Sequence, residues 1–158
     1  SFDTAAGAHV VKIVSQCFGH TKPVCDGMAN STGQIAELTT CAVIDYDRGL
    51  HFGLSGLPSQ AFTVLYMAPG ELAGPVQPIG TCLGTQAFAV LLDSTGPVFN
   101  AHADGTAHVR MSLSKHARFP SSSWLAGTTW AFQANYGDIG LDGVPVLAWS
   151  DAIELTLP

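Results

Sequence analysis

Short runs of alternating apolar and polar residues recur along the chain, and this period of two constrains the fold more than any other feature. In residues 130–136 one parity holds Trp130, Phe132, Ala134 and Tyr136, while the other includes Gln133 and Asn135. Similar alternation covers three further runs: 50–55, 109–114 and 153–157. Successive side chains of a β-strand point to opposite faces, so each run supplies one apolar and one polar face. Since no window of about 12 residues has helical spacing, the pattern predicts an all-β fold.

Turn-forming residues separate these runs at short intervals. They include the following pairs: Leu57-Pro58, Pro69-Gly70, Gly96-Pro97 and Asp104-Gly105. Gly permits positive φ and Pro fixes φ, so such pairs mark chain reversals. The continuously apolar runs 63–68 and 88–92 are typical of central strands, and 9–15 and 35–44 are weaker candidates. Together they predict an antiparallel β-sandwich, jelly-roll or immunoglobulin-like, of eight or nine strands.

The chain carries few charges, and these are mostly acidic. Charged residues make up 11% of the sequence, against about a quarter in ordinary soluble domains. The net charge is −6, from 12 acidic residues and six Lys or Arg without a basic cluster. This balance argues against nucleic acid and against an anionic membrane surface as partners. No apolar stretch reaches the ~18 residues of a membrane span, so we expect no membrane insertion. The low charge predicts a neutral surface or one partly buried against other subunits.

Four cysteines, Cys17, Cys25, Cys41 and Cys82, form an even set without a C-x-x-C pair. That spacing disfavours zinc-ribbon and thioredoxin-like sites and favours two disulfides. Disulfides indicate an oxidising compartment, so we expect an extracellular or cell-surface protein. Three connectivities are open, and at least one disulfide must lie within the first third of the chain.

Several short motifs follow one another in a recognisable order. In sequence they are Cys25 with Asn30-Ser31-Thr32-Gly33, Gly56-Leu57-Pro58, Thr81-Cys82-Leu83-Gly84, Ala126-Gly127 with Phe132-Gln133, and Ser150-Asp151-Ala152-Ile153-Glu154. This order resembles a poorly characterised family of β-rich domains, usually found toward the C-termini of large secreted proteins of environmental bacteria. The resemblance covers 25–157 and implies a fold and a location, without an established activity. We therefore expect an N-terminal extension, 1–24, and a β-sandwich domain, 25–158.

Catalytic and metal-binding patterns are weak. The nearest match to a serine-hydrolase elbow is Gly53-Leu54-Ser55-Gly56, in which the second glycine falls one position early and no helix pattern follows. His102 and His108 are the closest histidine cluster, but a two-residue hairpin turn at Asp104-Gly105 would place residue 102 opposite 107 and direct the two imidazoles to opposite faces. We expect no enzyme activity, no metal and no cofactor.

The N-terminal extension suggests a structural role for the protein. Residues 8–15 have high strand propensity, and Val10, Val11, Ile13 and Val14 are their apolar members. Such a segment could add to a neighbouring subunit's sheet, so the first functional hypothesis is an extracellular assembly subunit, in a filament or surface layer, whose partners are copies of itself. The alternative is that 9–15 is the first strand of the chain's own sandwich.

A second hypothesis is a carbohydrate-binding or adhesive module whose partners are glycans. Aromatic side chains near loops or strand ends can stack on sugars, and three candidates are Trp124, Tyr136 and Trp149. Trp130 lies within an alternating run, so we expect it in the core.

Overall fold

A computed structural model describes residues 21–41, 49–70, 81–84, 86–92, 96–112 and 127–156. These residues form nine strands. In chain order they are β1 (Thr21–Cys25), β2 (Glu37–Cys41), β3 (Gly49–Ser55), β4 (Phe62–Pro69), β5 (Phe88–Ala89), β6 (Val98–Asn100), β7 (Ala107–Ser112), β8 (Thr129–Ile139) and β9 (Pro145–Thr156).

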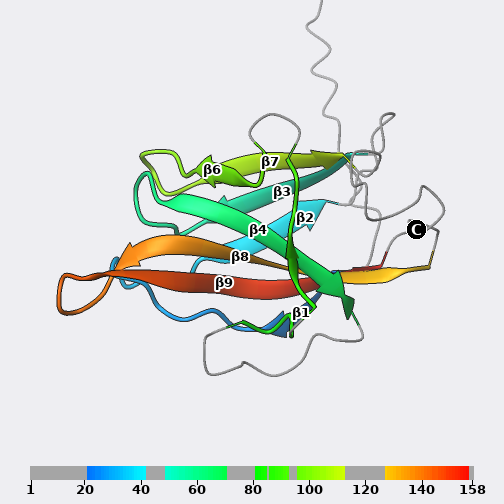
Figure 1. The fold of residues 1–158 in the computed structure, drawn as a ribbon, viewed down its shortest axis with the longest axis horizontal. Coiled ribbons are helices and arrows are strands. Elements are labelled where there is room, and N and C mark those ends of the chain that lie inside the picture. Colours follow the sequence, from blue (N-terminus) through cyan, green and yellow to red (C-terminus); the bar gives the residue numbers. More distant parts are fainter. Residues whose placement is uncertain are drawn as a thin grey trace, which may run out of the picture.

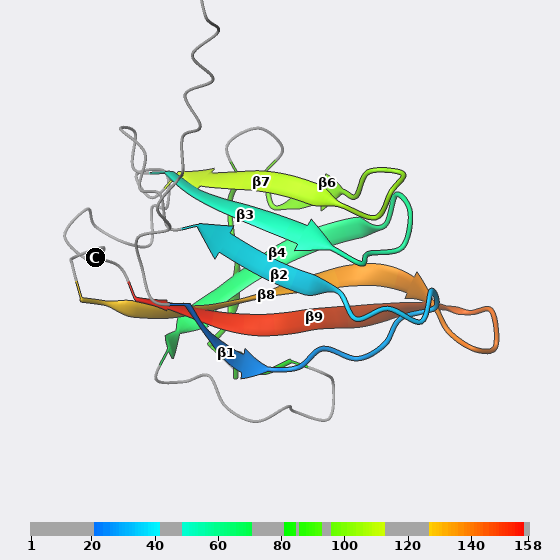
Figure 2. The same cartoon turned by 180° about the vertical axis from the view of Figure 1, so that it is seen from behind.

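The strands form two antiparallel sheets that lie face to face (Figures 1 and 2). The six-stranded sheet has the order β1-β9-β8-β4-β5. The sixth strand, β6, pairs with residues 62–64 of β4, and β5 pairs with residues 66–67 of the same strand. The three-stranded sheet has the order β2-β3-β7. The predicted all-β sandwich is confirmed, with a strand count in the expected range.

The core lies between the two sheets and follows the period-two pattern of the sequence. Phe52 of β3 and Phe132 of β8 are buried, with ring centroids 4.8 Å apart. Leu50 and Leu54 flank Phe52 on the same face of β3, and Trp130 lies two residues before Phe132 on β8. Burying these rings and aliphatic groups supplies the main driving force for packing the two layers.

Two boundaries differ from the sequence-based expectations. The run 88–92, expected to be a central strand, contributes only the two-residue edge strand β5. Its apolar residues nevertheless contribute to the main core, where Val90 and Leu92 are buried and Phe88 packs against the buried cluster. A second small core, in which Leu83 packs with Ala68 and Ala131, lies on the outer face of the six-stranded sheet. In addition, β1 begins at Thr21 and pairs with β9, so residues 21–24 of the predicted extension form part of the six-stranded sheet.

A β-bulge interrupts β9 where it crosses the middle of β8. Gln133 pairs with Ala152 and Asn135 with Trp149, so Ser150 and Asp151 together lie opposite Ala134. A bulge of this kind shifts the alternation of a strand by one residue. Core-facing positions are therefore even-numbered before the bulge, as at Ala148, and odd-numbered after it, as at Ile153 and Leu155.

A disulfide joins Cys25 of β1 to Cys82, 57 residues later in the chain. The predicted presence of disulfides is confirmed for this pair. This pairing excludes the two connectivities in which Cys25 bonds to Cys17 or to Cys41. Cys17 itself lies outside the described residues.

Gln133 lies beneath the disulfide segment and is fully buried. Its Oε1 accepts the N–H of Cys82 at 2.9 Å, and its Nε2 donates to the carbonyl of Ser150 at 2.9 Å. The Ser150 hydroxyl accepts the N–H of Ala134 at 2.9 Å. The polar face predicted at Gln133 is therefore not a solvent-facing surface, because the segment 81–84 covers it and uses its amide.

Candidate functional site

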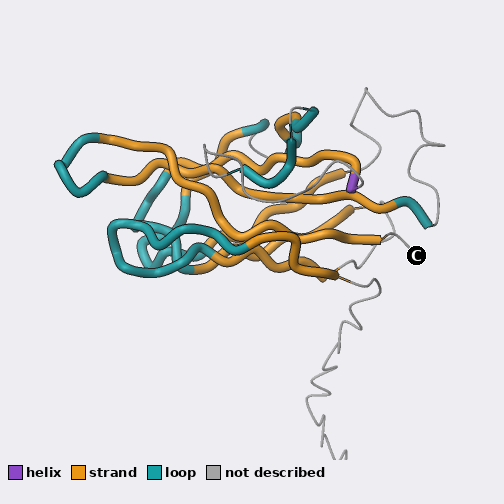
Figure 3. Tube along the Cα trace, turned by 90° about the horizontal axis from the view of Figure 1, so that it is seen from below, coloured by secondary structure: helices purple, strands orange, loops and turns teal. Residues whose placement is uncertain are grey.

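The β8–β9 hairpin projects beyond the rest of the sandwich (Figures 1 and 3). It also carries an apolar surface. Its exposed apolar residues are Ile139, Leu141, Val144, Val146 and Leu147. Leu141 at the tip is completely exposed, and Leu147 is 61% exposed. A tight turn closes the hairpin, with the N–H of Gly140 donating to the carbonyl of Val144 at 2.8 Å. We call residues 137–148 the apolar hairpin.

A groove runs along each side of the apolar hairpin. The larger, of about 490 Å³, lies between the hairpin and residues 58–62. Its wall includes Phe62, whose ring covers Gly137 so closely that a Cβ there would lie 2.4 Å from the ring. The smaller groove, of about 330 Å³, lies between the hairpin and residues 28–31 and is lined in part by Met28 and Trp149. Exposed apolar clusters of this kind on soluble domains commonly mark interaction surfaces.

The base of the hairpin is fixed by a polar network from the turn 30–34. The Asn30 amide nitrogen donates to the carbonyl of Gly56 at 2.6 Å, and its Oδ1 accepts the N–H of Thr32 at 3.0 Å. The N–H of Ser31 donates to Asp138 Oδ2 at 2.9 Å, and the Ser31 hydroxyl donates to Oδ1 of the same carboxylate. Asn30 and Asp138 are both buried. This network holds the hairpin against the neighbouring loop.

Replacing Asp138 with asparagine tests this network. Burial raises the pKa of Asp138, but hydrogen bonds from the Ser31 hydroxyl and the backbone of Ile139 and Ser31 outweigh it, so the pKa lies below the ordinary 3.8. A carboxyl group whose pKa is lowered in the folded state stabilises the fold at pH values above its ordinary pKa. This stabilisation is lost as the pH falls through the folded-state pKa. We expect Asp138→Asn to lower the free energy of unfolding by about 1–2 kcal/mol at pH 7, and by less below about pH 3.8.

Urea unfolding of both proteins between pH 7 and pH 3 measures this difference. Asp142→Asn is the matched control, because Asp142 lies at the exposed hairpin tip and accepts only a local bond from the N–H of Val144. The control should change stability by less than about 0.5 kcal/mol. An Asp138→Asn difference that stays constant over the whole pH range would contradict the role given to the carboxylate.

The aromatic residues predicted to contact a ligand have different positions in the structure. Tyr136 is fully buried in the core, so its assignment as a ligand-stacking aromatic is wrong. Its parity in the run 130–136 already placed it with Trp130 on the core face. Trp149 is partly buried and packs on Tyr66, with ring centroids 5.5 Å apart and planes inclined by 52°, so these two rings do not form a flat platform. Trp124 lies outside the described residues.

The assembly-strand residues Val10, Val11, Ile13 and Val14 also lie outside the described residues.

The apolar hairpin is not among the sites predicted from the sequence, although one signal for it was present. Residues 144–147 are continuously apolar and directly follow the turn pair Asp142-Gly143. Such a run resembles a buried strand unless its neighbours are known.

The turn at residues 102–106 differs from the two-residue hairpin turn predicted at Asp104-Gly105. The N–H of His102 donates to the carbonyl of Thr106 at 2.7 Å, so residue 102 lies opposite 106 and not 107. The strands on either side of this turn, β6 and β7, belong to different sheets. Over the described part of the chain, no group of three His, Cys, Asp or Glu residues is placed to hold a metal ion.

No protein-family model matches the chain, and no curated protein is similar to it. The described residues also contain no helix with the length and hydropathy needed to cross a membrane.

Proposed function

We propose that this chain is an extracellular structural subunit that assembles with copies of itself. The observation that carries the proposal is the apolar hairpin, which exposes Leu141, Val144 and Leu147 between two grooves. A second copy is the partner with matching chemistry, because an apolar projection beside an apolar groove on the same molecule allows head-to-tail contact between copies. The low charge content of 11% also suits a surface that becomes buried.

Three of the edge strands among the described residues, β1, β2 and β7, are partly blocked to an added strand. Edge strand β1 contains Pro23, which has no N–H to donate. On β2, the carboxylate of Asp151 accepts the N–H of Leu38 at 2.5 Å, and on β7, Met111 is bridged by Leu92. We therefore propose that the apolar hairpin provides the main contact between copies, and that strand addition by residues 8–15 uses a sheet edge other than these three.

Light scattering of the purified, non-reduced protein, combined with negative-stain microscopy, tests the proposal. Regular assemblies much larger than the 16.5 kDa monomer are expected. Leu147→Asp should weaken association about tenfold or more while leaving a folded monomer, since Leu147 is exposed and its substitution buries no charge in the monomer. The double variant Val11→Asp, Ile13→Asp should have the same effect if residues 8–15 join neighbouring copies.

Leu91→Asp is the control for the hairpin variant. Leu91 is 45% exposed and follows β5, which pairs with the opposite end of β4 from Phe62. Association of this variant should equal that of the wild type. A wild-type protein that remains monomeric at high concentration would overturn the proposal. Equal losses of association in Leu147→Asp and Leu91→Asp would show that the hairpin is not the contact between copies.

A further inference from the structure

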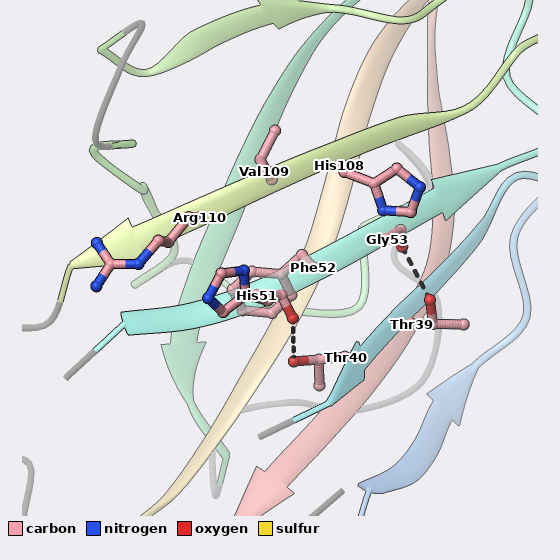
Figure 4. A pocket seen from close by; sticks show the side chains of 8 residues that line it. All are labelled: Thr39, Thr40, His51, Phe52, Gly53, His108, Val109 and Arg110. Carbon is pink, nitrogen blue, oxygen red and sulfur yellow. Dashed lines mark hydrogen bonds between the residues drawn. The ribbon is translucent and has the colours of Figure 1, made fainter. Parts of the chain in front are cut away.

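A third groove, of about 360 Å³, lies on the outer face of the three-stranded sheet (Figure 4). Its position follows from the sequence of the central strand β3. Residues 49, 51, 53 and 55 share the outer face of that strand, and they are Gly, His, Gly and Ser. A strand that presents so few side-chain atoms is lower than its neighbours, so β2 and β7 form walls on either side. We call this feature the polar groove.

Basic side chains line the polar groove in two adjacent rows of the sheet. In one row Gly53 lies between Thr39 and His108, and in the next row His51 pairs with Arg110. The Arg110 guanidinium extends over Gly49, where an added Cβ would lie 2.3 Å from Nε, so a larger residue at 49 would displace it. Two imidazoles and a guanidinium therefore face one hollow on a chain whose net charge is −6.

Hydrogen-bond acceptors lie beside these donors. The hydroxyl of Thr39 donates to the carbonyl of Gly53 at 3.2 Å, and that of Thr40 donates to the carbonyl of His51 at 2.7 Å (Figure 4). Because each hydroxyl proton is used by the backbone, the oxygen lone pairs remain as acceptors for a ligand. The polar groove thus combines donors suited to an anion with acceptors suited to sugar hydroxyls.

We propose that the polar groove binds an acidic saccharide, a sugar that carries carboxylate or sulfate groups. Arg110 would pair with the anionic group, since a guanidinium binds planar oxyanions through two parallel N–H bonds. His51 and His108 would donate to ring or hydroxyl oxygens, and Thr39 would accept from a hydroxyl. An acidic peptide fits less well, because peptides gain affinity from pairing with a sheet edge and this groove lies on a sheet face. This binding role is separate from the proposed assembly through the hairpin.

Binding of short alginate oligomers, which carry uronate groups, and of low-molecular-weight dextran sulfate can be measured by calorimetry at low and at physiological salt. Neutral dextran and poly-glutamate serve as comparison ligands. Arg110→Gln and the double variant His51→Gln, His108→Gln should each weaken binding about tenfold or more. Lys22→Gln, which removes one positive charge from the exposed part of β1 on the other sheet, is the matched control and should bind like the wild type.

Amide shift mapping of the wild-type protein provides a readout that does not depend on the variants folding. With an acidic saccharide, shifts concentrated at Thr39, His51, Gly53 and His108 support the proposal. Binding of alginate oligomers but not dextran sulfate, or the reverse, identifies which anionic group the groove accepts. Equal binding of neutral dextran, equal or tighter binding of poly-glutamate, an equal loss in Lys22→Gln, or no binding of either acidic saccharide would each overturn it.

Discussion

Replacing Gln133 with leucine is expected to lower the free energy of unfolding by about 2–6 kcal/mol. The Gln133 amide joins three parts of the fold, because it accepts from Cys82, donates to the carbonyl of Ser150 and lies on β8. Leucine has a similar volume but cannot form these bonds. The N–H of Cys82 and the carbonyl of Ser150 would then be buried without partners, at a cost of about 1–3 kcal/mol each.

Urea unfolding at neutral pH measures the loss directly. Gln86→Leu is the matched control, since Gln86 is exposed on the segment that follows the disulfide. The control should change stability by less than about 0.5 kcal/mol. A Gln133→Leu protein as stable as the control would mean that Gln133 is not needed to hold the segment 81–84 on the sheet.

Removing the Cys25–Cys82 disulfide is expected to cost roughly 4 kcal/mol. The estimate follows from the loop of 57 residues that the disulfide closes in the unfolded chain. The double variant Cys25→Ala, Cys82→Ala avoids unpaired thiols and keeps small side chains at both positions. It should also raise the dependence of stability on urea, because the unfolded chain without this link exposes more surface.

Unfolding of the double variant should be compared with that of the triple variant that also carries Gln133→Leu. Gln133 Nε2 lies 3.9 Å from Cys82 Sγ, so the two changes affect the same contact region and should not be additive. A combined loss smaller than the sum is expected, because the segment 81–84 can leave the sheet once the disulfide is absent. Additive losses, or a double-variant loss below about 1 kcal/mol, would contradict this account.

The parts of the fold that could be predicted are strands along which apolar and polar residues alternate without interruption. The alternation at 50–55 predicted β3, and that at 130–136 predicted most of β8, with Trp130 in the core. The alternation at 153–157 likewise predicted the second half of β9. In these runs the burial of one face decides the position of every second side chain, so local sequence carries the information.

The candidate surfaces could not be predicted in the same way, because each is made by segments far apart in the chain. The polar groove needs Thr39, Gly53 and His108 in one row, which is a property of strand order and register. The apolar hairpin is exposed because no other described segment packs over residues 144–147. An apolar run in the sequence does not by itself distinguish a buried strand from an exposed one. The pairing of Cys25 with Cys82 also depends on the tertiary fold, which brings β1 near the segment 81–84.

The bulge at Ser150 and Asp151 has a consequence for how this molecule can diversify. Because it reverses the phase of β9, substitutions at 145, 147 and 149 change the outer surface, while the same parity at 153 and 155 belongs to the core. A substitution at 147 therefore changes the exposed surface, whereas one at 153 or 155 changes the core, although all three positions have the same parity. The hairpin beyond the bulge can therefore change in sequence or length without altering the core positions at 153 and 155.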